Sequence, residues 1–351
     1  MEKKITMKDI ANKLNISINA VSIALNNRVG VSDEMRIKIL RIANEMGYLN
    51  KRAKFVRTFS RSNLCIMMQK IYSSDMNFYG KVLYSIVEEA KKFGYDTLMV
   101  FFDDDELAIP NCIEEHKVAG IIVIGKISDY NIEILNERNL PIVLVDHASL
   151  SNSIDSVLTD NKLGGFIMTK YLIEQGFEKI GFFGDLDYSL SIKERFFGFI
   201  EAISTCSSLA DLEGINEYIK KYSITHNIES AVLDNNNSSI IDLIVSAAHL
   251  PEVFVCSNDK AAISLLMALQ SLKYRVPENI SLVGFDNIDM CEKITPNLTT
   301  INVDKEKMGR RAVERIRYAI DHKSNSHENI VLSVELIQRE SVKLLNKIHL
   351  T

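Results

Sequence analysis

Five acidic or amide side chains stand where apolar, strand-like runs end: Asp146, Asp160, Asn258, Asp259 and Asp286. In an open parallel sheet, ligands bind outside the carboxyl ends of the strands. Carboxylate and amide groups there accept and donate hydrogen bonds, as a polyhydroxylated ligand requires. The pattern predicts a site for a small polar molecule. The competing interpretation is that these residues form turns and cap helices.

Motifs typical of enzymes do not appear in the sequence. It contains no GxSxG, P-loop or HExxH pattern, and the seven His residues are scattered. His147 follows Asp146, and it either lines the site or is solvated. The five Cys residues include no CxxC pair, so we expect buried thiols. We therefore expect a protein that is not an enzyme and holds no metal or cofactor.

Alternating apolar runs and amphipathic segments dominate the chain after residue 63. The expected strands are 64–68, 97–102, 120–124, 142–145, 180–183, 253–256 and 280–285. The clearest expected helices are 78–93, 161–175, 192–203 and 259–272. Continuous apolar strands separated by helices indicate parallel sheets covered on both faces. The halves 64–146 and 156–286 look like two copies of one architecture.

Residues 6–49 predict a different element, a trio of short helices. Thr6 can cap the first helix, with Asp9 in a capping-box position, and Ser17 and Ser32 can cap the next two. The second helix is expected over 18–25, with Val21 and Leu25 pointing inward. Helix, short turn, helix and then a supporting helix is an arrangement that places a recognition helix in the major groove.

Charge is divided unevenly along the chain. Residues 1–62 hold thirteen Lys or Arg and five Asp or Glu, a net charge of +8, while the whole chain carries −5. Such a basic arm on an acidic body suits DNA binding. The 351 residues suggest two or three domains. The absence of a signal peptide and of a long apolar stretch favours the cytoplasm and argues against a membrane partner.

The N-terminal string resembles the headpiece of the lactose-repressor/galactose-repressor (LacI-type) family. The matching motifs are MKDIA at 7–11, ISINAVS at 16–22, ALNN at 24–27, VSDEMR at 31–36 and GY at 47–48. Further similar motifs run through the body: PIVLVD at 141–146, SIKERFFGFI at 191–200, VPENISLVGFD at 276–286 and QRES at 338–341. The resemblance therefore covers nearly the whole chain.

The resemblance implies an α/β fold with three parts. These are a helix-turn-helix DNA-binding domain over 1–50, a hinge over 51–62, and an effector-binding and dimerisation body over 63–345. The body is expected to resemble periplasmic sugar-binding proteins, with two lobes and two parallel sheets. Lobe 1 would be about 63–158 and 291–323, and lobe 2 about 159–290 and 324–345.

The resemblance also assigns residues to two sites. Ile18, Asn19 and Ile23 would face bases, Ser22 would lie near the backbone, and Thr6, Ser17 and Asn26 would belong to the same DNA-binding surface. Asn19 can bond adenine, and Ile23 can pack on a thymine methyl, so an A·T-leaning half-site is expected. In the cleft, Arg195, Phe78 and Tyr79 would join Asp146, Asp160, Asn258, Asp259 and Asp286 around a sugar-like effector.

The hinge departs from the family pattern. Arg57 falls where relatives carry a Leu that wedges into the minor groove. Either Phe55 or Phe59 serves as the wedge, or Arg52, Lys54 and Arg57 only neutralise phosphates, or the hinge is not helical.

Taken together, the sequence predicts a cytoplasmic, dimeric, allosteric transcription regulator, a repressor by family analogy. Its expected partners are double-stranded operator DNA and a small sugar-like effector. The alternative is a cytoplasmic sugar-binding protein whose N-terminal helices mediate protein contacts. The missing signal peptide and the basic headpiece argue against that alternative.

Overall fold

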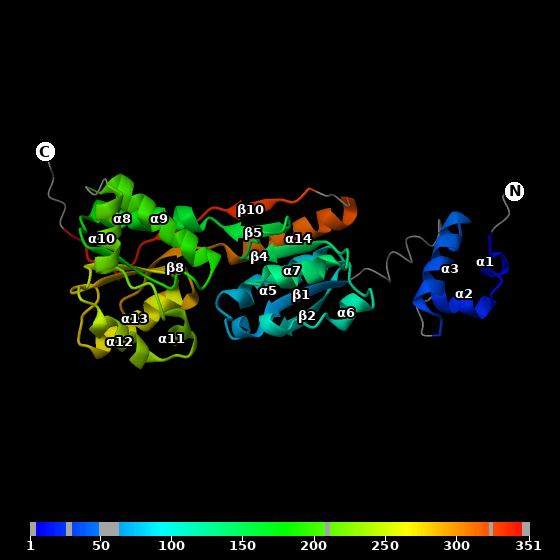
Figure 1. The fold of residues 1–351 in the computed structure, drawn as a ribbon, viewed down its shortest axis with the longest axis horizontal. Helices are drawn as coiled ribbons and strands as arrows, with labels where there is room; N and C mark the ends of the chain where they lie inside the picture. The colour runs from blue at the N-terminus through cyan, green and yellow to red at the C-terminus, as the bar shows by residue number, and fades with distance from the viewer. Residues whose placement is uncertain (1–4, 26–29, 49–62, 208–210, 323–325, 346–351) are drawn as a thin grey trace.

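The computed structural model describes residues 5–25, 30–48, 63–207, 211–322 and 326–345. An N-terminal helical headpiece precedes a body of two α/β lobes (Figure 1). The predicted Asn26, Arg52, Lys54 and Arg57, together with the rest of the hinge, lie outside the described residues.

The headpiece consists, in its described part, of α1 (Met7–Leu14), α2 (Ile18–Leu25) and α3 (Asp33–Glu45). The predicted caps are confirmed. Thr6 and Asp9 form a capping box, Ser17 Oγ accepts a hydrogen bond from Ala20 N at 3.0 Å, and Ser32 Oγ accepts one from Met35 N at 3.3 Å. These bonds satisfy helix N–H groups that have no partner within the helix.

A small apolar core fixes the three helices against one another. Its buried members are Ile10, Ala11, Val21, Ala24, Ile39 and Ala43. Leu25, expected to point inward with Val21, is only partly buried, and the smaller Ala24 takes the inner position. The core leaves the first turn of α2 exposed.

Lobe 1 is built on a parallel sheet with strand order β10-β5-β4-β3-β1-β2. Its strands are β1 (Asn63–Gln69), β2 (Asp96–Phe102), β3 (Gly120–Ile124), β4 (Ile142–Val145), β5 (Asp155–Thr159) and β10 (Asn329–Leu332). Its helices are α5 (Tyr79–Lys92), α6 (Asn111–Glu114), α7 (Asp129–Asn136) and α14 (Lys305–His322), with short 3-10 turns η1 (Lys70–Tyr72) and η2 (Asp104–Glu106).

Both faces of this sheet are buried, which explains the continuous apolar runs. Side chains from β1 alternate between the faces. Leu64 and Ile66 pack with α5 and α14, whereas Cys65 and Met67 pack with α6 and α7. The predicted layered arrangement is therefore present.

Lobe 2 repeats the design with strand order β11-β9-β8-β7-β6. Its strands are β6 (Ile180–Phe183), β7 (Val253–Cys256), β8 (Ser281–Asp286), β9 (Thr299–Asn302) and β11 (Glu335–Ile337), of which β11 is antiparallel to β9. Its helices are α8 (Asn161–Gln175), α9 (Leu190–Cys206), α10 (Leu212–Tyr222), α11 (Glu229–Leu233), α12 (Asn237–Ser246) and α13 (Asp259–Ser271), with η3 (Asp289–Glu292).

The chain crosses between the lobes after β5, after β9 and after β10 (Figure 1). The first crossing agrees with the expected boundary near 158. The expected boundaries at 291 and 323 lie too early, because β9 still belongs to the lobe 2 sheet and β10 still belongs to the lobe 1 sheet. Strands β5, β9, β10 and β11 were missing from the predicted set because they are short and mix polar with apolar residues.

Among the described residues, no helix combines the length and apolar character that a membrane crossing needs.

Candidate ligand cleft and DNA-binding headpiece

A cavity of about 120 Å³ lies where the two lobes face each other. Lobe 1 contributes the region around η1 and α5 together with the end of β4, and lobe 2 contributes the start of α9 and the ends of β7 and β8. Six of the eight predicted effector residues line it: Phe78, Tyr79, Asp146, Arg195, Asn258 and Asp286. Typical drug-sized sites are about 300–1,000 Å³, so this cavity suits a small ligand.

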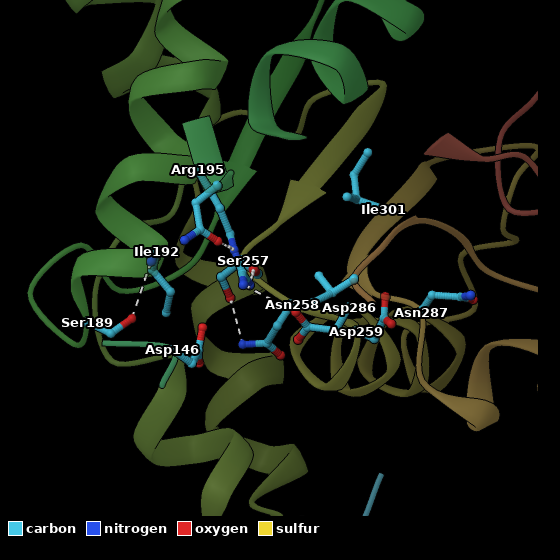
Figure 2. A network of polar contacts seen from close by, with 12 residues as sticks. Asp146, Ser189, Ile192, Arg195, Ser257, Asn258, Asp259, Asp286, Asn287 and Ile301 are labelled. Carbon is cyan, nitrogen blue, oxygen red and sulfur yellow. Dashed lines mark hydrogen bonds and ion pairs between the residues drawn. The ribbon is translucent and has the colours of Figure 1, made fainter. Parts of the chain in front are cut away.

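Arg195 is the central cation of the cavity and is only 4% exposed. It projects from the first turns of α9, whose N-cap Ser189 accepts a hydrogen bond from Ile192 N at 3.3 Å. Its Nε donates to Asn161 Oδ1 at 2.9 Å, its Nη1 to Ser257 O at 2.6 Å, and its Nη2 to Asp286 Oδ1 at 3.2 Å (Figure 2). The guanidinium also lies 3.8 Å from the centre of the Phe285 ring. These contacts fix its orientation before any ligand enters.

Asp286 ends β8 in an uncommon backbone conformation, with φ of 107°. Lys305 Nζ donates to its carbonyl oxygen. Burial raises the pKa of the Asp286 carboxyl, and the positive charges of Arg195 and Lys305 oppose that rise. Strained non-glycine backbone of this kind costs about 1–3 kcal/mol and concentrates at binding sites.

Asp146 directly follows β4 on the opposite lobe and also has a positive φ, 59°. Its Oδ2 accepts a hydrogen bond from the Tyr79 hydroxyl at 3.0 Å. Its Oδ1 is buried and has no hydrogen-bond partner. Burial raises the pKa of Asp146 to about 7, the negative charge of Asp286 adds to the rise, and Arg195 opposes it. Because an unsatisfied buried acceptor is costly, Asp146 is poised to accept a hydrogen bond from a ligand.

Asn258 and Phe78 complete the cavity. Asn258 caps α13 by accepting from Ala261 N at 2.9 Å, and its Nδ2 donates to Ser257 Oγ at 3.3 Å (Figure 2). Phe78 packs edge-on against Tyr79, with ring centres 5.0 Å apart. Such an aromatic wall complements the apolar face of a sugar ring.

Two predicted effector residues do not line the cavity. Asp160 caps α8 by accepting from Leu163 N at 3.0 Å. Asp259 is fully buried and accepts from Thr300 Oγ1 at 2.6 Å and from Ile288 N at 2.9 Å. Asp160 is thus a helix cap and Asp259 satisfies buried donors of lobe 2, so we leave both out of the proposed effector set.

The cavity also contains charged residues that strand-end reasoning missed: Asp75, Lys126, Glu229 and Lys260. Glu229 begins the short helix α11 and accepts from Ser257 Oγ at 2.6 Å. Burial raises the pKa of Glu229 to about 7. His147 lines the cavity as well, and burial lowers its pKa. None of the four charged residues ends a strand, so the sequence pattern carried no signal for them.

Three polar contacts bridge the lobes beside the cavity. Lys260 pairs with Asp75 at 2.9 Å, Lys126 Nζ donates to Tyr188 O at 3.2 Å, and Lys81 pairs with Asp289 at 2.5 Å. Each contact joins groups that would separate if the cleft opened. The described geometry is therefore that of a closed cleft.

The headpiece exposes its predicted base-reading residues to different degrees. Ile18 is 47% exposed and Asn19 is exposed, at the start of α2. Ser22 and Ile23 are half-buried, and Ile23 lies close to Gly30. Thr6 and Ser17 are exposed and cap helices. Of the predicted base-facing residues, Ile18 and Asn19 are therefore the most accessible to a DNA groove.

The five cysteines are free thiols, and the expectation that all are buried is wrong. Cys112 and Cys206 are half-buried because each lies near the end of a surface helix.

Known proteins share both parts of this architecture. Residues 6–50 match the family described as bacterial regulatory proteins, lacI family, and residues 169–342 match the periplasmic binding protein-like domain. The chain is 25% identical to the HTH-type transcriptional repressor PurR of Mannheimia succiniciproducens, over 96% of this chain and 98% of that protein.

Solved structures agree on the fold. A LacI family transcriptional regulator from Enterococcus faecium with bound ribose has a TM-score of 0.68 and 21% identity, over 80% of this chain and 100% of that chain. The lac repressor dimer bound to operator and an anti-inducer has a TM-score of 0.65 and 19% identity, over 97% of this chain and 99% of that chain.

A helix-turn-helix headpiece on a two-lobed body with a ligand cleft defines a DNA-binding transcriptional regulator that responds to a small molecule. The chain thus carries a helix-turn-helix domain of the LacI family of bacterial regulatory proteins and a periplasmic-binding-protein-like domain. The curated relatives that it matches are named as transcriptional repressors rather than enzymes.

Proposed function

We propose that this regulator is a cytoplasmic homodimer that represses transcription from a pseudo-palindromic operator and is released or engaged by a sugar-like effector. The observation that carries the proposal is the convergence of Asp146 from one lobe with Arg195 and Asp286 from the other, in a cleft that belongs to the same chain as the headpiece. Groups from both lobes meeting at one ligand allow that ligand to set the lobe angle.

Three similar proteins support particular parts of the proposal. The PurR protein of Mannheimia succiniciproducens is named a repressor, and the Enterococcus faecium regulator binds ribose. The lac repressor binds its operator as a dimer. Two-fold symmetry would place two copies of α2 in successive major grooves of a pseudo-palindromic site.

The effector residues we propose are Phe78, Tyr79, Asp146, Arg195, Asn258 and Asp286. The DNA-reading residues we propose are Ile18 and Asn19, with Ser22 and Ile23 beside them and Thr6 and Ser17 at the helix starts. Asn26 and the hinge residues Arg52, Lys54 and Arg57 remain proposals from the sequence.

The test is operator selection from genomic fragments, followed by fluorescence anisotropy with the full chain and with residues 63–351. Only the full chain should bind specifically. If six or more phosphates are contacted, affinity should fall roughly 10³-fold between 50 and 200 mM salt. Specific binding by the headpiece-free body would contradict the assignment. Ligand-induced stabilisation of that body provides the control that it remains folded.

A further inference from the structure

The charges that line the cleft distinguish one class of effector from another. In the described lining, the cations are Lys126, Arg195 and Lys260, and the carboxylates are Asp75, Asp146, Glu229 and Asp286. Above about pH 7, where Asp146 and Glu229 are ionised, the carboxylates outnumber the cations. His147 adds no charge near neutral pH, because burial lowers its pKa.

The two cations next to carboxylates are already paired. Arg195 bonds Asp286 at 3.2 Å and has two further acceptors. Lys260 bonds Asp75 at 2.9 Å, and the Asp75 side chain is only 14% exposed. A phosphate that approached Arg195 or Lys260 would have to compete with Asp286 or Asp75 for that cation. The Lys260 side chain is 38% exposed, but the Asp75 and Asp286 side chains are each 14% exposed, so separating either pair strands a shielded carboxylate, which is costly.

Lys126 is the remaining cation of the described lining. Its side chain is exposed and its ammonium donates to Tyr188 O, across the gap between the lobes. An exposed charge is screened by water and salt. It therefore provides little attraction for an anion held deeper in the cavity.

The inner wall presents a carboxylate oxygen that no donor of the described lining satisfies. Asp146 Oδ1 is buried with no partner, and the negative charge of Asp286 acts on Asp146 from the other lobe. Above about pH 7, where Asp146 is ionised, an anion between these carboxylates would add a third negative charge in a poorly hydrated space, where repulsion is strong. A hydroxyl group there would instead donate to Asp146 and satisfy it.

We infer that the effector is an uncharged, monosaccharide-sized polyol that donates hydroxyl hydrogens to Asp146, and that phosphorylated sugars are excluded. This inference rests on the proposed function and specifies its ligand. The cavity volume of about 120 Å³ fits a single ring. Asp75 acts as a gatekeeper because it occupies Lys260, the cation that a phosphate would need.

The experiment compares matched pairs on the full chain by thermal shift and calorimetry. The pairs are aldo- and keto-pentoses and hexoses, among them D-ribose and D-glucose, each against its monophosphate. A neutral sugar should bind at least tenfold more tightly than its monophosphate. A monophosphate that binds as well as its neutral partner, or a panel in which no neutral sugar binds, would overturn the inference.

Two variants sharpen the test. D75N keeps an oxygen for the hydrogen bond from Phe78 N (3.1 Å) but releases Lys260, so it should gain at least tenfold affinity for the monophosphate. D103N removes the surface partner of Lys70 outside the cleft and should gain none. Equal gains, or no gain in D75N, would contradict the gatekeeper role.

D146N should weaken binding of the neutral sugar at least tenfold, because the Asn amide group places a donor where Asp146 has an unpaired acceptor. Unchanged affinity would contradict the role of Asp146. Operator binding, measured on the same preparations, distinguishes a failure of this inference from a failure of the proposed function. A chain that binds operator but prefers a monophosphate refutes this inference and leaves the regulator standing, whereas one that binds no operator refutes the proposed function.

Discussion

The residues that form the headpiece core lie close together in the sequence, whereas the residues that form the cleft lie far apart. The headpiece core unites Ile10, Val21 and Ile39 within a single short stretch. The cleft unites Asp75 of lobe 1 with Arg195 and Asp286 of lobe 2, and these three residues lie far apart along the chain. A change in the headpiece should therefore act on DNA binding alone, while a change in the cleft should affect both ligand binding and the body that supports it.

The largest effect that tests this contrast is expected from Arg195→Ala. The substitution removes the buried partner of Asp286 and leaves Asn161 Oδ1 without its donor. Breaking a buried pair costs roughly 3–5 kcal/mol, so urea unfolding of the body should move by that amount and sugar binding should be lost. Operator affinity of the ligand-free, folded variant should stay within a few-fold. Arg275→Ala, at an exposed site of lobe 2, is the control. A loss under 1 kcal/mol would refute the central place of Arg195.

Asn19→Ala should act on the other region. Asn19 is exposed at the start of α2, and a base-edge contact is worth about 1–3 kcal/mol of discrimination. Specific operator should therefore be bound more weakly by that amount, with little change on random DNA, when both are measured by anisotropy. Asn12→Ala on α1 controls for a change of surface alone. An equal loss of affinity for both DNAs would show that Asn19 contacts phosphate. A change in sugar affinity would contradict the expectation that headpiece substitutions act on DNA binding alone.

Acidity should affect the cleft and spare the headpiece. Because burial raises the pKa of Asp146 to about 7, protonation below that pH removes the acceptor that the sugar needs. Sugar affinity should fall by up to about tenfold per pH unit below 7 and level off above 8. The difference between the wild type and D146N isolates this group from Glu229 and Asp259, whose pKa values burial also raises to about 7. The same dependence of sugar affinity on pH in the wild type and in D146N would contradict the role of Asp146.

Stability should depend on pH in the opposite sense. The folded state binds the Asp146 proton more tightly than the unfolded chain does, so this group stabilises folding at acidic pH. That contribution is lost as the pH rises from about 4 through about 7.

The smallest expected effect is at a helix cap. Thr6→Ala removes the capping box with Asp9, and loss of an N-cap costs about 1 kcal/mol. The helical circular dichroism of the headpiece should melt earlier, and Thr6→Ser should restore it. Sugar binding should not change, because the cap has no contact with the cleft. An unchanged melt would show that α1 is held by its apolar core alone.

The same difference in distance explains what the sequence could predict. Caps and helical spacing are local, so the bounds of α2 and the caps at Thr6, Ser17 and Ser32 followed directly from the residues. Long apolar strands such as β3 were equally plain. Strand β5 begins with Asp155, which is buried and pairs with Arg315 at 2.8 Å. No local pattern reveals a partner that far along the chain.

The site shows the same limit. The strand-end rule found Asp146, Asn258 and Asp286, which line the cavity. It also selected Asp160 and Asp259, because a strand-end carboxylate can equally cap the next helix or satisfy buried donors. Asp75 and Glu229 were missed, since their place in the cleft depends on how the two lobes face each other.

The central claim is that the cleft and the headpiece are energetically coupled. The direct test titrates the best neutral sugar of the matched panel into the full chain, with and without saturating operator, and titrates operator with and without that sugar. Coupling is reciprocal, so one factor, typically about 5–150-fold, must appear in both titrations. The account predicts two equal factors clearly different from one. Identical sugar affinities with and without operator would show that this cleft does not control the headpiece.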